Sequence, residues 1–309
     1  MSTLDQYLSN SLKALERWRP ALQVRLARRA RPDYRKSPLP TAIVEEALPS
    51  GERAAIASFE YPVWPPALST VLEGIPEPPA YSAVLGICED GLPFLFDLTN
   101  PAPGALLLVG EAGSGKTRLI RAVLHAVRLM NPPEKALFSV LAAQPEEYSD
   151  LGSLDHCQEL FPVEEPGVEE LIADLVEITE SRKLSGPQDP VYLLVIDDLT
   201  ALLPFLDERS FSRLYWLIRH GPRYRVWTLA GLAAEQASQL DGRFLSAFRT
   251  RLFGFMHNER QACLLAGDES LATSDLEKGL QFLVPYGGDW LRFWLCEPDS
   301  HDLDGDRPE

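Results

Sequence analysis

The chain has 309 residues, of which 45% are hydrophobic and 24% charged, and its formal net charge is −16. This is an ordinary globular composition with enough apolar mass for a substantial core. No run approaches the about 18 apolar residues that span a bilayer, and the N-terminus lacks the apolar region of a secretory signal. The four cysteines are scattered with no C-x-x-C spacing, which argues against a disulfide or zinc framework. We therefore expect a cytoplasmic protein with no integral membrane segment.

Residues 1–36 differ in charge from the rest of the chain. They hold nine Lys/Arg and three acids, a balance of +6, whereas the remainder carries 20 basic and 42 acidic residues, a balance of −22. Leucines at helical spacing predict an amphipathic helical segment here. A basic arm on an acidic body could meet nucleic acid, an acidic membrane surface or a neighbouring subunit. A docking helix with a solvated charged face is the simplest interpretation.

Residues 37–81 are interpreted as a linker or a strap that lies over a surface. Six prolines fall within "PVWPPALSTVLEGIPEPPA" at 62–80. Proline removes a backbone donor and fixes φ, so this density excludes a helix interior or a central strand. The main domain is therefore predicted to begin at residue 82 and to end near residue 296. The acidic tail over 297–309 is predicted to be disordered.

The main domain alternates apolar strands with helices. A hairpin is expected at 83–98, where Asp90-Gly91 joins two apolar runs. The other predicted strands are 105–109, 136–143, 191–198, 225–231 and 250–256, and the predicted helices are 117–130, 168–183, 208–221 and 237–248. Continuous apolar strands between helices predict an α/β fold with a mostly parallel sheet covered on both faces.

"GEAGSGKT" matches G-x-x-x-x-G-K-[ST], a phosphate-binding loop (P-loop), between a predicted strand and a predicted helix. Its glycines let backbone N–H groups converge on phosphate oxygens, and the helix adds its positive end. Lys116 would neutralise the β- and γ-phosphates, and the Thr117 hydroxyl would bind Mg²⁺. The predicted ATP-binding residues are Gly110, Glu111, Ala112, Gly113, Ser114, Gly115, Lys116, Thr117 and Arg118. The fold class is therefore a RecA-like P-loop NTPase.

"VYLLVIDD" supplies the second half of such a site. Asp197 stands at the end of an apolar strand, where a P-loop enzyme places the carboxylate that orders Mg²⁺. Asp198 follows it, and its side chain is expected to point toward the γ-phosphate as a catalytic carboxylate. Two acids at a strand end can also be solvated or can cap the next helix. The P-loop some eighty residues upstream favours the metal role for Asp197.

Over about residues 82–296 the chain resembles the FtsK/SpoIIIE branch of the FtsK–HerA P-loop ATPases. The lead-in "GICEDGLPFLFDLTNPAPGALLLVGEAGSGKT" is similar to the family's strand, turn and P-loop strand. "EEYSDLGSLDHC" and "LVEITESRK" resemble its Pro-His-Leu segment and its helix ending in Glu-x-x-Arg, which matches His156 and Arg182. "FRTRLFG" resembles its Pro-Thr-Arg-Ile strand, which matches Thr250 and Arg251.

The resemblance implies a ring motor, a hexamer as in the family, that couples ATP hydrolysis to movement of double-stranded DNA. Related type VII secretion ATPases act on protein substrates instead. The resemblance also implies an arginine that reaches the neighbouring subunit's γ-phosphate, with Arg251 or Arg249 as the candidates. Either could equally be a strand-end or surface arginine.

The chain departs from the family at two positions of the site. The family has Glu where this chain has Asp198, and Asp is one methylene shorter, which alters its reach to an attacking water. Where the family's sensor strand ends in Thr-Gln, this chain is expected to have Ala230-Gly231. These departures motivate a third hypothesis, a weakly hydrolysing nucleotide-binding module that regulates assembly.

The partner of such an ATPase stays open between DNA and protein. DNA binding depends on neutralising phosphates, so the −22 balance of residues 37–309 argues against DNA. A local cluster of Arg213, Arg219, Arg223 and Arg225 could provide a DNA contact, although such a cluster is more often a solvated turn. An acidic body suits a protein partner better.

Overall fold

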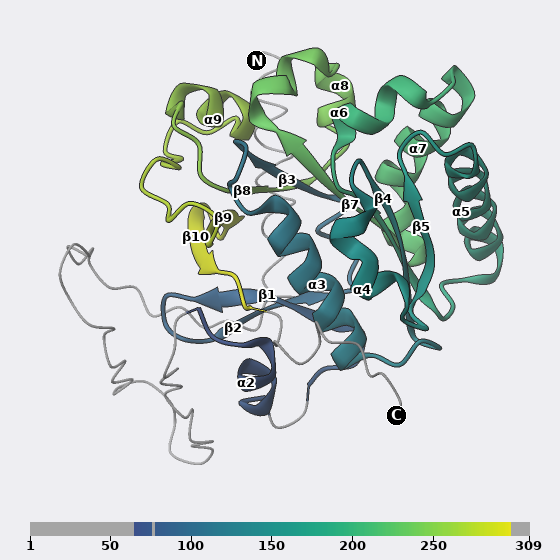
Figure 1. The fold of residues 1–309 in the computed structure, drawn as a ribbon, viewed down its shortest axis with the longest axis horizontal. Coiled ribbons are helices and arrows are strands. Elements are labelled where there is room, and N and C mark those ends of the chain that lie inside the picture. The colour runs from purple at the N-terminus through teal and green to yellow at the C-terminus, as the bar shows by residue number, and fades with distance from the viewer. Residues whose placement is uncertain (1–64, 76–77, 298–309) are drawn as a thin grey trace, which may run out of the picture.

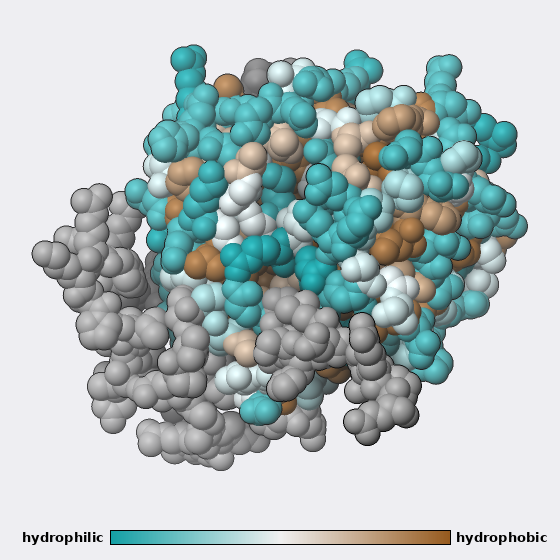
Figure 2. Space-filling model, in the orientation of Figure 1, coloured by the Kyte–Doolittle hydropathy of each residue, from teal (hydrophilic) through white to brown (hydrophobic). Residues whose placement is uncertain are grey.

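The structure is a computed structural model, and it describes residues 65–75 and 78–297. The basic segment 1–36, most of the predicted linker and the tail beyond residue 297 lie outside the described residues. The predictions made for those segments therefore stay predictions. Within the described part, no helix is long and apolar enough to cross a bilayer. Most of the face drawn in Figure 2 is hydrophilic, with only small apolar patches.

One ten-stranded sheet forms the centre of the described part, in the order β2-β1-β10-β9-β8-β3-β7-β6-β4-β5 (Figure 1). The strands are β1 (Ser82–Cys88), β2 (Pro93–Asp97), β3 (Leu106–Gly110), β4 (Ala136–Ala142), β5 (Cys157–Pro162), β6 (Val191–Ile196), β7 (Val226–Ala233), β8 (Thr250–Phe253), β9 (Gln281–Tyr286) and β10 (Asp289–Trp294). The run from β8 to β5 is parallel, and β9, β10, β1 and β2 continue it antiparallel. The predicted α/β class is confirmed.

Two apolar layers explain why the parallel strands are apolar throughout. Leu106 and Leu108 of β3 face the cluster that includes α3 (Lys116–Met130), whereas Leu107 and Val109 face the cluster that includes α5 (Gly167–Ser185) and α7 (Glu208–His220). In Figure 1, α3 crosses the near side of the sheet while α5 and α7 lie to the right. With both faces covered, every side chain of β3 is buried.

Short helices and turns complete the fold. They are α2 (Leu68–Glu73), η1 (Pro145–Tyr148), α4 (Ser149–Gly152), α6 (Leu199–Leu202), η2 (Leu203–Phe205), η3 (Gly221–Tyr224), η4 (Ala234–Gln239), α8 (Gly242–Leu245) and α9 (Glu259–Ala266). The helix predicted over 237–248 is wrong in its extent, because η4 and α8 divide that stretch. The turn η4 ends at Gln239, and Asp241 caps α8 by accepting from Arg243 N at 2.8 Å.

The proline-rich stretch also differs from its prediction. Residues 68–73, between Pro66 and Pro76, form the short helix α2, and this interval contains no proline. Leu68 and Val71 are buried in the same cluster as β1. Ala67 forms a parallel bridge with Glu297, whose N–H donates to Pro66 O at 3.0 Å. The described end of the strap and Glu297 of the predicted tail therefore pack on the main domain.

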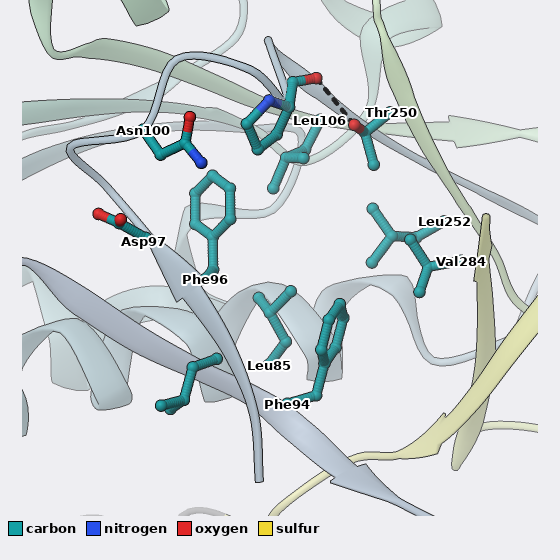
Figure 3. Close-up of a pocket in the computed structure, with 11 residues that line it drawn as sticks. Leu85, Phe94, Phe96, Asp97, Asn100, Leu106, Thr250, Leu252 and Val284 are labelled. Atoms are coloured by element: carbon teal, nitrogen blue, oxygen red, sulfur yellow. Dashed lines mark hydrogen bonds between the residues drawn. The ribbon is translucent and has the colours of Figure 1, made fainter. Parts of the chain in front are cut away.

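The predicted hairpin is confirmed as β1 and β2, which pair antiparallel with a register shift between Val84 and Gly86. A small apolar cavity of about 20 Å³ lies beneath it. Figure 3 shows Leu85, Phe94 and Phe96 on the hairpin side and Leu252 and Val284 on the opposite side. This volume holds about one water molecule, so the cavity is a packing defect and cannot admit a nucleotide.

Candidate nucleotide-binding site

The P-loop leaves the carboxyl end of β3 and enters α3, as predicted. Gly113 and Gly115 have φ of 73° and 92°, a region that side chains rarely adopt. A Cβ at Gly115 would lie 2.7 Å from Gly279 O, and one at Gly110 would lie 2.3 Å from Ser114 Oγ. The loop therefore needs glycine both for its curl and for its close packing. This geometry explains why three of its eight residues are glycine.

The loop offers an anion site at the N-terminus of α3. Gly115 is the N-cap of this 15-residue helix and supplies no side-chain acceptor to the N–H groups of the first turn. Those N–H groups and the helix dipole favour a phosphate. Lys116 Nζ donates to Gly110 O at 2.9 Å and to Glu111 O at 3.0 Å, so its ammonium lies against the loop backbone. The residues present fit a bound polyphosphate.

The structure brings the two predicted magnesium residues together. Thr117 Oγ1 donates to Asp197 Oδ1 at 3.0 Å. The contact follows from the sheet order, because β6 and β3 flank β7 and all three strands end at the same edge. A hydroxyl and a carboxylate are hard oxygen ligands of the kind that Mg²⁺ prefers. No group of three or more His, Cys, Asp or Glu residues suited to a metal occurs among the described residues, so nucleotide phosphate would have to complete the coordination.

Asp198 is the N-cap of α6. Its Oδ1 accepts from Thr200 N at 2.8 Å, from Thr200 Oγ1 at 2.6 Å and from Ala201 N at 3.4 Å. Gln236 also contacts the Thr200 hydroxyl, which links the capping group to the turn after β7. The capping alternative is therefore realised. The catalytic role of Asp198 stays a prediction, and it would have to coexist with this cap.

A third carboxylate, Glu235, lies near the P-loop lysine. Burial lowers the pKa of the Lys116 ammonium, and the negative charges of Glu235, Asp198 and Asp197 oppose that shift, with Glu235 the largest of the three. Sequence reasoning missed Glu235 because it expected the strand to end at Ala230-Gly231. That boundary is wrong, since β7 continues to Ala233, which pairs with Gly110. The strand therefore delivers Glu235 and Gln236 to the P-loop edge.

Gly231 has a structural explanation rather than a phosphate-sensing one. A Cβ at this position would lie 2.0 Å from the backbone oxygen of Asp197. Contacts this short do not occur between real atoms, so β6 and β7 would have to separate to accept any side chain. Glycine here allows the strand that carries Asp197 to lie close to β7.

A segment near the C-terminal end of the domain covers the P-loop from another side. Arg118 donates to Gly279 O at 3.0 Å and forms an ion pair with Glu297. The Lys278 side chain lies beside Gly113, since a Cβ there would be 3.3 Å from Lys278 Cε, and its ammonium lies 5.5 Å from the Phe255 ring centroid. Sequence reasoning missed Lys278. Its only signal was its place in the closing segment that resembles the family.

Arg251 is held within its own chain. It donates to Leu245 O at 2.8 Å and to Leu265 O, and burial lowers the pKa of its guanidinium. The strand register sets Arg251 beside Leu107, three residues before Gly110. Arg249 precedes β8 and packs against Gly104, at the opposite edge of the sheet. A role in trans for either arginine stays a prediction.

His156 and Arg182, which also match the family, form hydrogen bonds to backbone carbonyls within the fold. His156 Nε2 lies 2.8 Å from Asn131 O, at the C-terminal end of α3. Arg182 donates to the carbonyls of Tyr224, Arg225 and Pro190 at 3.0, 3.3 and 2.6 Å. Arg225, from the arginine cluster considered for DNA, forms an ion pair with Asp189 at 2.7 Å. None of these contacts involves the P-loop.

Comparison with known proteins gives relatives of one kind. No protein-family model matches the chain. It is 25% identical over 190 residues to the ESX-5 secretion system protein EccC5 of Mycobacterium marinum, and this match covers 53% of the chain. The chain spans only 13% of the length of that relative.

Solved structures give the same picture. EssC (ATPases 2 and 3) from Geobacillus thermodenitrificans is similar with a TM-score of 0.60 at 15% identity, covering 73% of this chain and 47% of that one. Thermomonospora curvata EccC, solved in complex with a signal sequence peptide, has a TM-score of 0.57 at 14% identity, and the match covers 72% of this chain and 41% of that one. The pCW3 conjugation coupling protein TcpA, solved with ATPγS, has a TM-score of 0.54 at 18% identity, and the match covers 72% of this chain and 68% of that one. These likenesses confirm the predicted α/β fold, which the chain shares with the ATPase domains of EssC and EccC and with TcpA.

Proposed function

We propose that this chain is an ATPase that binds ATP with Mg²⁺ at the P-loop and hydrolyses it. The observation that carries the proposal is the 3.0 Å hydrogen bond from Thr117 to Asp197, formed beside a lysine that lies against the same loop. The two halves of a P-loop site are 80 residues apart in sequence, and the order of the strands in the sheet brings them together. A glycine-rich turn without a ligand would not require that meeting.

Each residue of the site has a distinct task in this proposal. The loop N–H groups and the first turn of α3 bind the phosphates, and Lys116 exchanges its two loop carbonyls for phosphate oxygens. Thr117 and Asp197 would hold Mg²⁺, and the ion would supply charge neutralisation for the phosphates. TcpA, a protein of the same fold, has been solved with ATPγS, which supports ATP as the nucleotide.

Two carboxylates could orient the attacking water. Asp198 directly follows the magnesium aspartate, and its cap leaves the carboxylate ordered at the edge of the site. Glu235 is exposed and influences Lys116 more strongly than either aspartate. We assign the catalytic role to Asp198 and treat Glu235 as the alternative. Because Asp198 is also used as a cap, turnover slower than in a motor with a free glutamate is expected.

The partner is proposed to be a protein. EccC5 is named as a secretion system protein, and Thermomonospora curvata EccC has been solved with a signal sequence peptide. The −22 balance of residues 37–309 disfavours a polyanion. Movement of double-stranded DNA is the second candidate, and the FtsK-type resemblance and the conjugation protein TcpA favour it. A homo-oligomeric ring, a hexamer as in the family, and a cytoplasmic location complete the proposal.

Steady-state ATP hydrolysis by the full chain tests the proposal. We expect Mg²⁺-dependent turnover that Lys116→Ala lowers by about 100-fold or more and that duplex DNA leaves unchanged. Acceleration by DNA of several-fold would transfer the proposal to the DNA translocase. Tight Mg²⁺-dependent binding without turnover would leave a nucleotide-controlled assembly module, and absence of nucleotide binding would overturn the proposed function. The mass of the protein in solution with ATP tests the proposed ring, and we expect the mass of a hexamer.

A further inference from the structure

Asp197, the proposed Mg²⁺ residue, accepts a second hydrogen bond from a residue that belongs to no sequence motif. Tyr148 Oη donates to Asp197 Oδ1 at 2.6 Å, the same oxygen that accepts from Thr117. Tyr148 is fully buried, with 0% of its surface exposed. This hydroxyl is therefore desolvated, and the only hydrogen bond it donates runs to the carboxylate of the site.

The chain holds Tyr148 in this place from two directions. It ends the turn η1 that follows β4, and β4 pairs with β6 so that Asp197 N donates to Leu141 O at 2.9 Å. On the other side, Arg121 of α3 forms two hydrogen bonds with Asp150, at 2.8 and 2.9 Å, and a third with Glu147 O. A bidentate arginine–carboxylate pair has a fixed geometry. The turn is thus fastened both to the strand of Asp197 and to the P-loop helix.

Two donors on one carboxylate oxygen constrain the rotation of the whole group. Thr117 gives its single proton to Oδ1, which leaves the lone pairs of its own oxygen for a cation. Tyr148 approaches the same oxygen, so the two contacts define the plane of the carboxylate and direct Oδ2. A phenol has an ordinary pKa of about 10 and is therefore protonated at neutral pH, so Tyr148 acts as a donor in this contact.

We propose that Tyr148 is a positioning residue that holds the Asp197 carboxylate in the orientation that receives Mg²⁺, with the Arg121–Asp150 pair anchoring its turn to the P-loop helix. The proposal rests on the proposed function, because it presumes a Mg²⁺–nucleotide complex at the P-loop. Groups that orient a metal ligand typically contribute about 10- to 100-fold to metal affinity. Since Thr117 still holds Asp197 when Tyr148 is changed, we expect the lower end of that range, about 10-fold.

The test measures binding rather than turnover. Full-length wild type, Tyr148→Phe and Tyr81→Phe are titrated with a fluorescent, slowly hydrolysed ATP analogue in EDTA and then with Mg²⁺ at fixed nucleotide. Tyr81→Phe is the matched control, because it also removes a tyrosine–aspartate hydrogen bond, to Asp189 at 2.5 Å, but at an exposed place. Thermal melting without ligand reports on folding.

Tyr148→Phe is expected to bind nucleotide in EDTA within twofold of wild type and to need about 10-fold more Mg²⁺ for half-maximal enhancement. Tyr81→Phe should match wild type in both. A Mg²⁺ midpoint within twofold of wild type, in a folded Tyr148→Phe protein, would overturn the inference. If that variant fails to fold, Arg121→Gln is measured in the same assay: a raised Mg²⁺ midpoint supports the inference, and an unchanged midpoint overturns it. Should wild type show no Mg²⁺-dependent binding, the proposed function fails instead.

Discussion

Polar residues have different roles at the two ends of the parallel strands. We call the side at which these strands end the carboxyl edge, and the side at which they begin the amino edge. At the carboxyl edge, Lys116, Thr117 and Asp197 bond to the loop or to one another, and each of these bonds can be exchanged for a bond to phosphate, Mg²⁺ or water. At the amino edge, Arg182 donates to three backbone carbonyls that have no such substitute. One edge is therefore organised for a ligand and the other for the fold itself.

The amino edge nevertheless carries most of the residues that match the FtsK-type pattern outside the nucleotide motifs. His156 holds the carbonyl of Asn131, and Asn131 Nδ2 donates to Ser82 O at 2.9 Å, so α3 is tied to β1. Arg225 lies 5.0 Å from the centroid of the Tyr81 ring. A match to a family pattern can thus mark architecture as readily as chemistry. Mutations at the two edges separate these meanings.

The largest effect is expected for Lys116→Ala at the carboxyl edge. Removing one preorganised charge from a phosphate site costs about 100- to 1,000-fold in turnover. Stability should be equal to or above that of wild type, because a partly buried ammonium is lost from a site that desolvates it. Kinetics of ATP hydrolysis together with urea unfolding measures both. A large loss of unfolding free energy that accompanies the loss of turnover would contradict the proposed role of Lys116 in binding the phosphates.

Arg182→Met should show the opposite behaviour at the amino edge. It leaves three carbonyls without their donor in a place where Arg182 is only 5% exposed, and it removes a stacking contact with the Tyr192 ring at 5.1 Å. We expect a loss of about 3 kcal/mol in the free energy of unfolding. Nucleotide affinity measured below the unfolding midpoint should stay within twofold. Lys183→Met, at an exposed neighbouring position, is the control and should change neither quantity.

A smaller effect on turnover distinguishes the two carboxylates of the carboxyl edge. Asparagine caps helices as well as aspartate does, so Asp198→Asn removes charge while keeping the cap of α6. We expect about a 100-fold lower kcat for Asp198→Asn and about 10-fold for Glu235→Gln, since general-base catalysis contributes about 100-fold or more. Single-turnover hydrolysis checks this order. A reversed order would make Glu235 the base and leave Asp198 as a cap alone.

Local sequence was enough to predict the parts of the site that lie in continuous segments. The P-loop, the apolar strand before Asp197 and the β1–β2 hairpin each carry their own pattern of glycines or periodicity, and each forms where it was expected. No pattern in the sequence predicted the order of the strands in the sheet. Thr117 and Asp197 were assigned to one Mg²⁺ site because a P-loop enzyme places such a carboxylate at the end of an apolar strand.

The remaining parts of the site depend on contacts between segments that share no pattern. Tyr148 reaches Asp197 because β4 lies beside β6, and Lys278 reaches Gly113 because a distant turn folds over the loop. A tyrosine after a proline turn and a lysine in a polar loop look like ordinary surface residues in sequence. The sequence suggested that Gly231 replaces a phosphate-sensing residue. The structure explains the glycine differently, because a Cβ at this position would lie 2.0 Å from the backbone oxygen of Asp197.

The smallest effect is expected for Asp189→Asn, at the exposed rim of the amino edge. Asp189 forms an ion pair with Arg225 at 2.7 Å and accepts from the Tyr81 hydroxyl, but its side chain is 42% exposed. Exposed ion pairs contribute about 0.2–1 kcal/mol, and Asn keeps an acceptor for the tyrosine. We expect unfolding in urea to shift by about 0.5 kcal/mol in low salt and by less in 0.5 M NaCl, where the charges are screened.

This result bears on how the amino edge acts. If Asp189→Asn is nearly neutral while Arg182→Met is costly, the stability of the edge comes from buried donors on backbone carbonyls rather than from its charge pairs. A loss from Asp189→Asn above about 2 kcal/mol would contradict that division. It would mean that Asp189, Arg225 and Tyr81 act as one network with Arg182. A double-mutant cycle of Asp189→Asn and Arg182→Met would then show a coupling energy, whereas independent contacts would add.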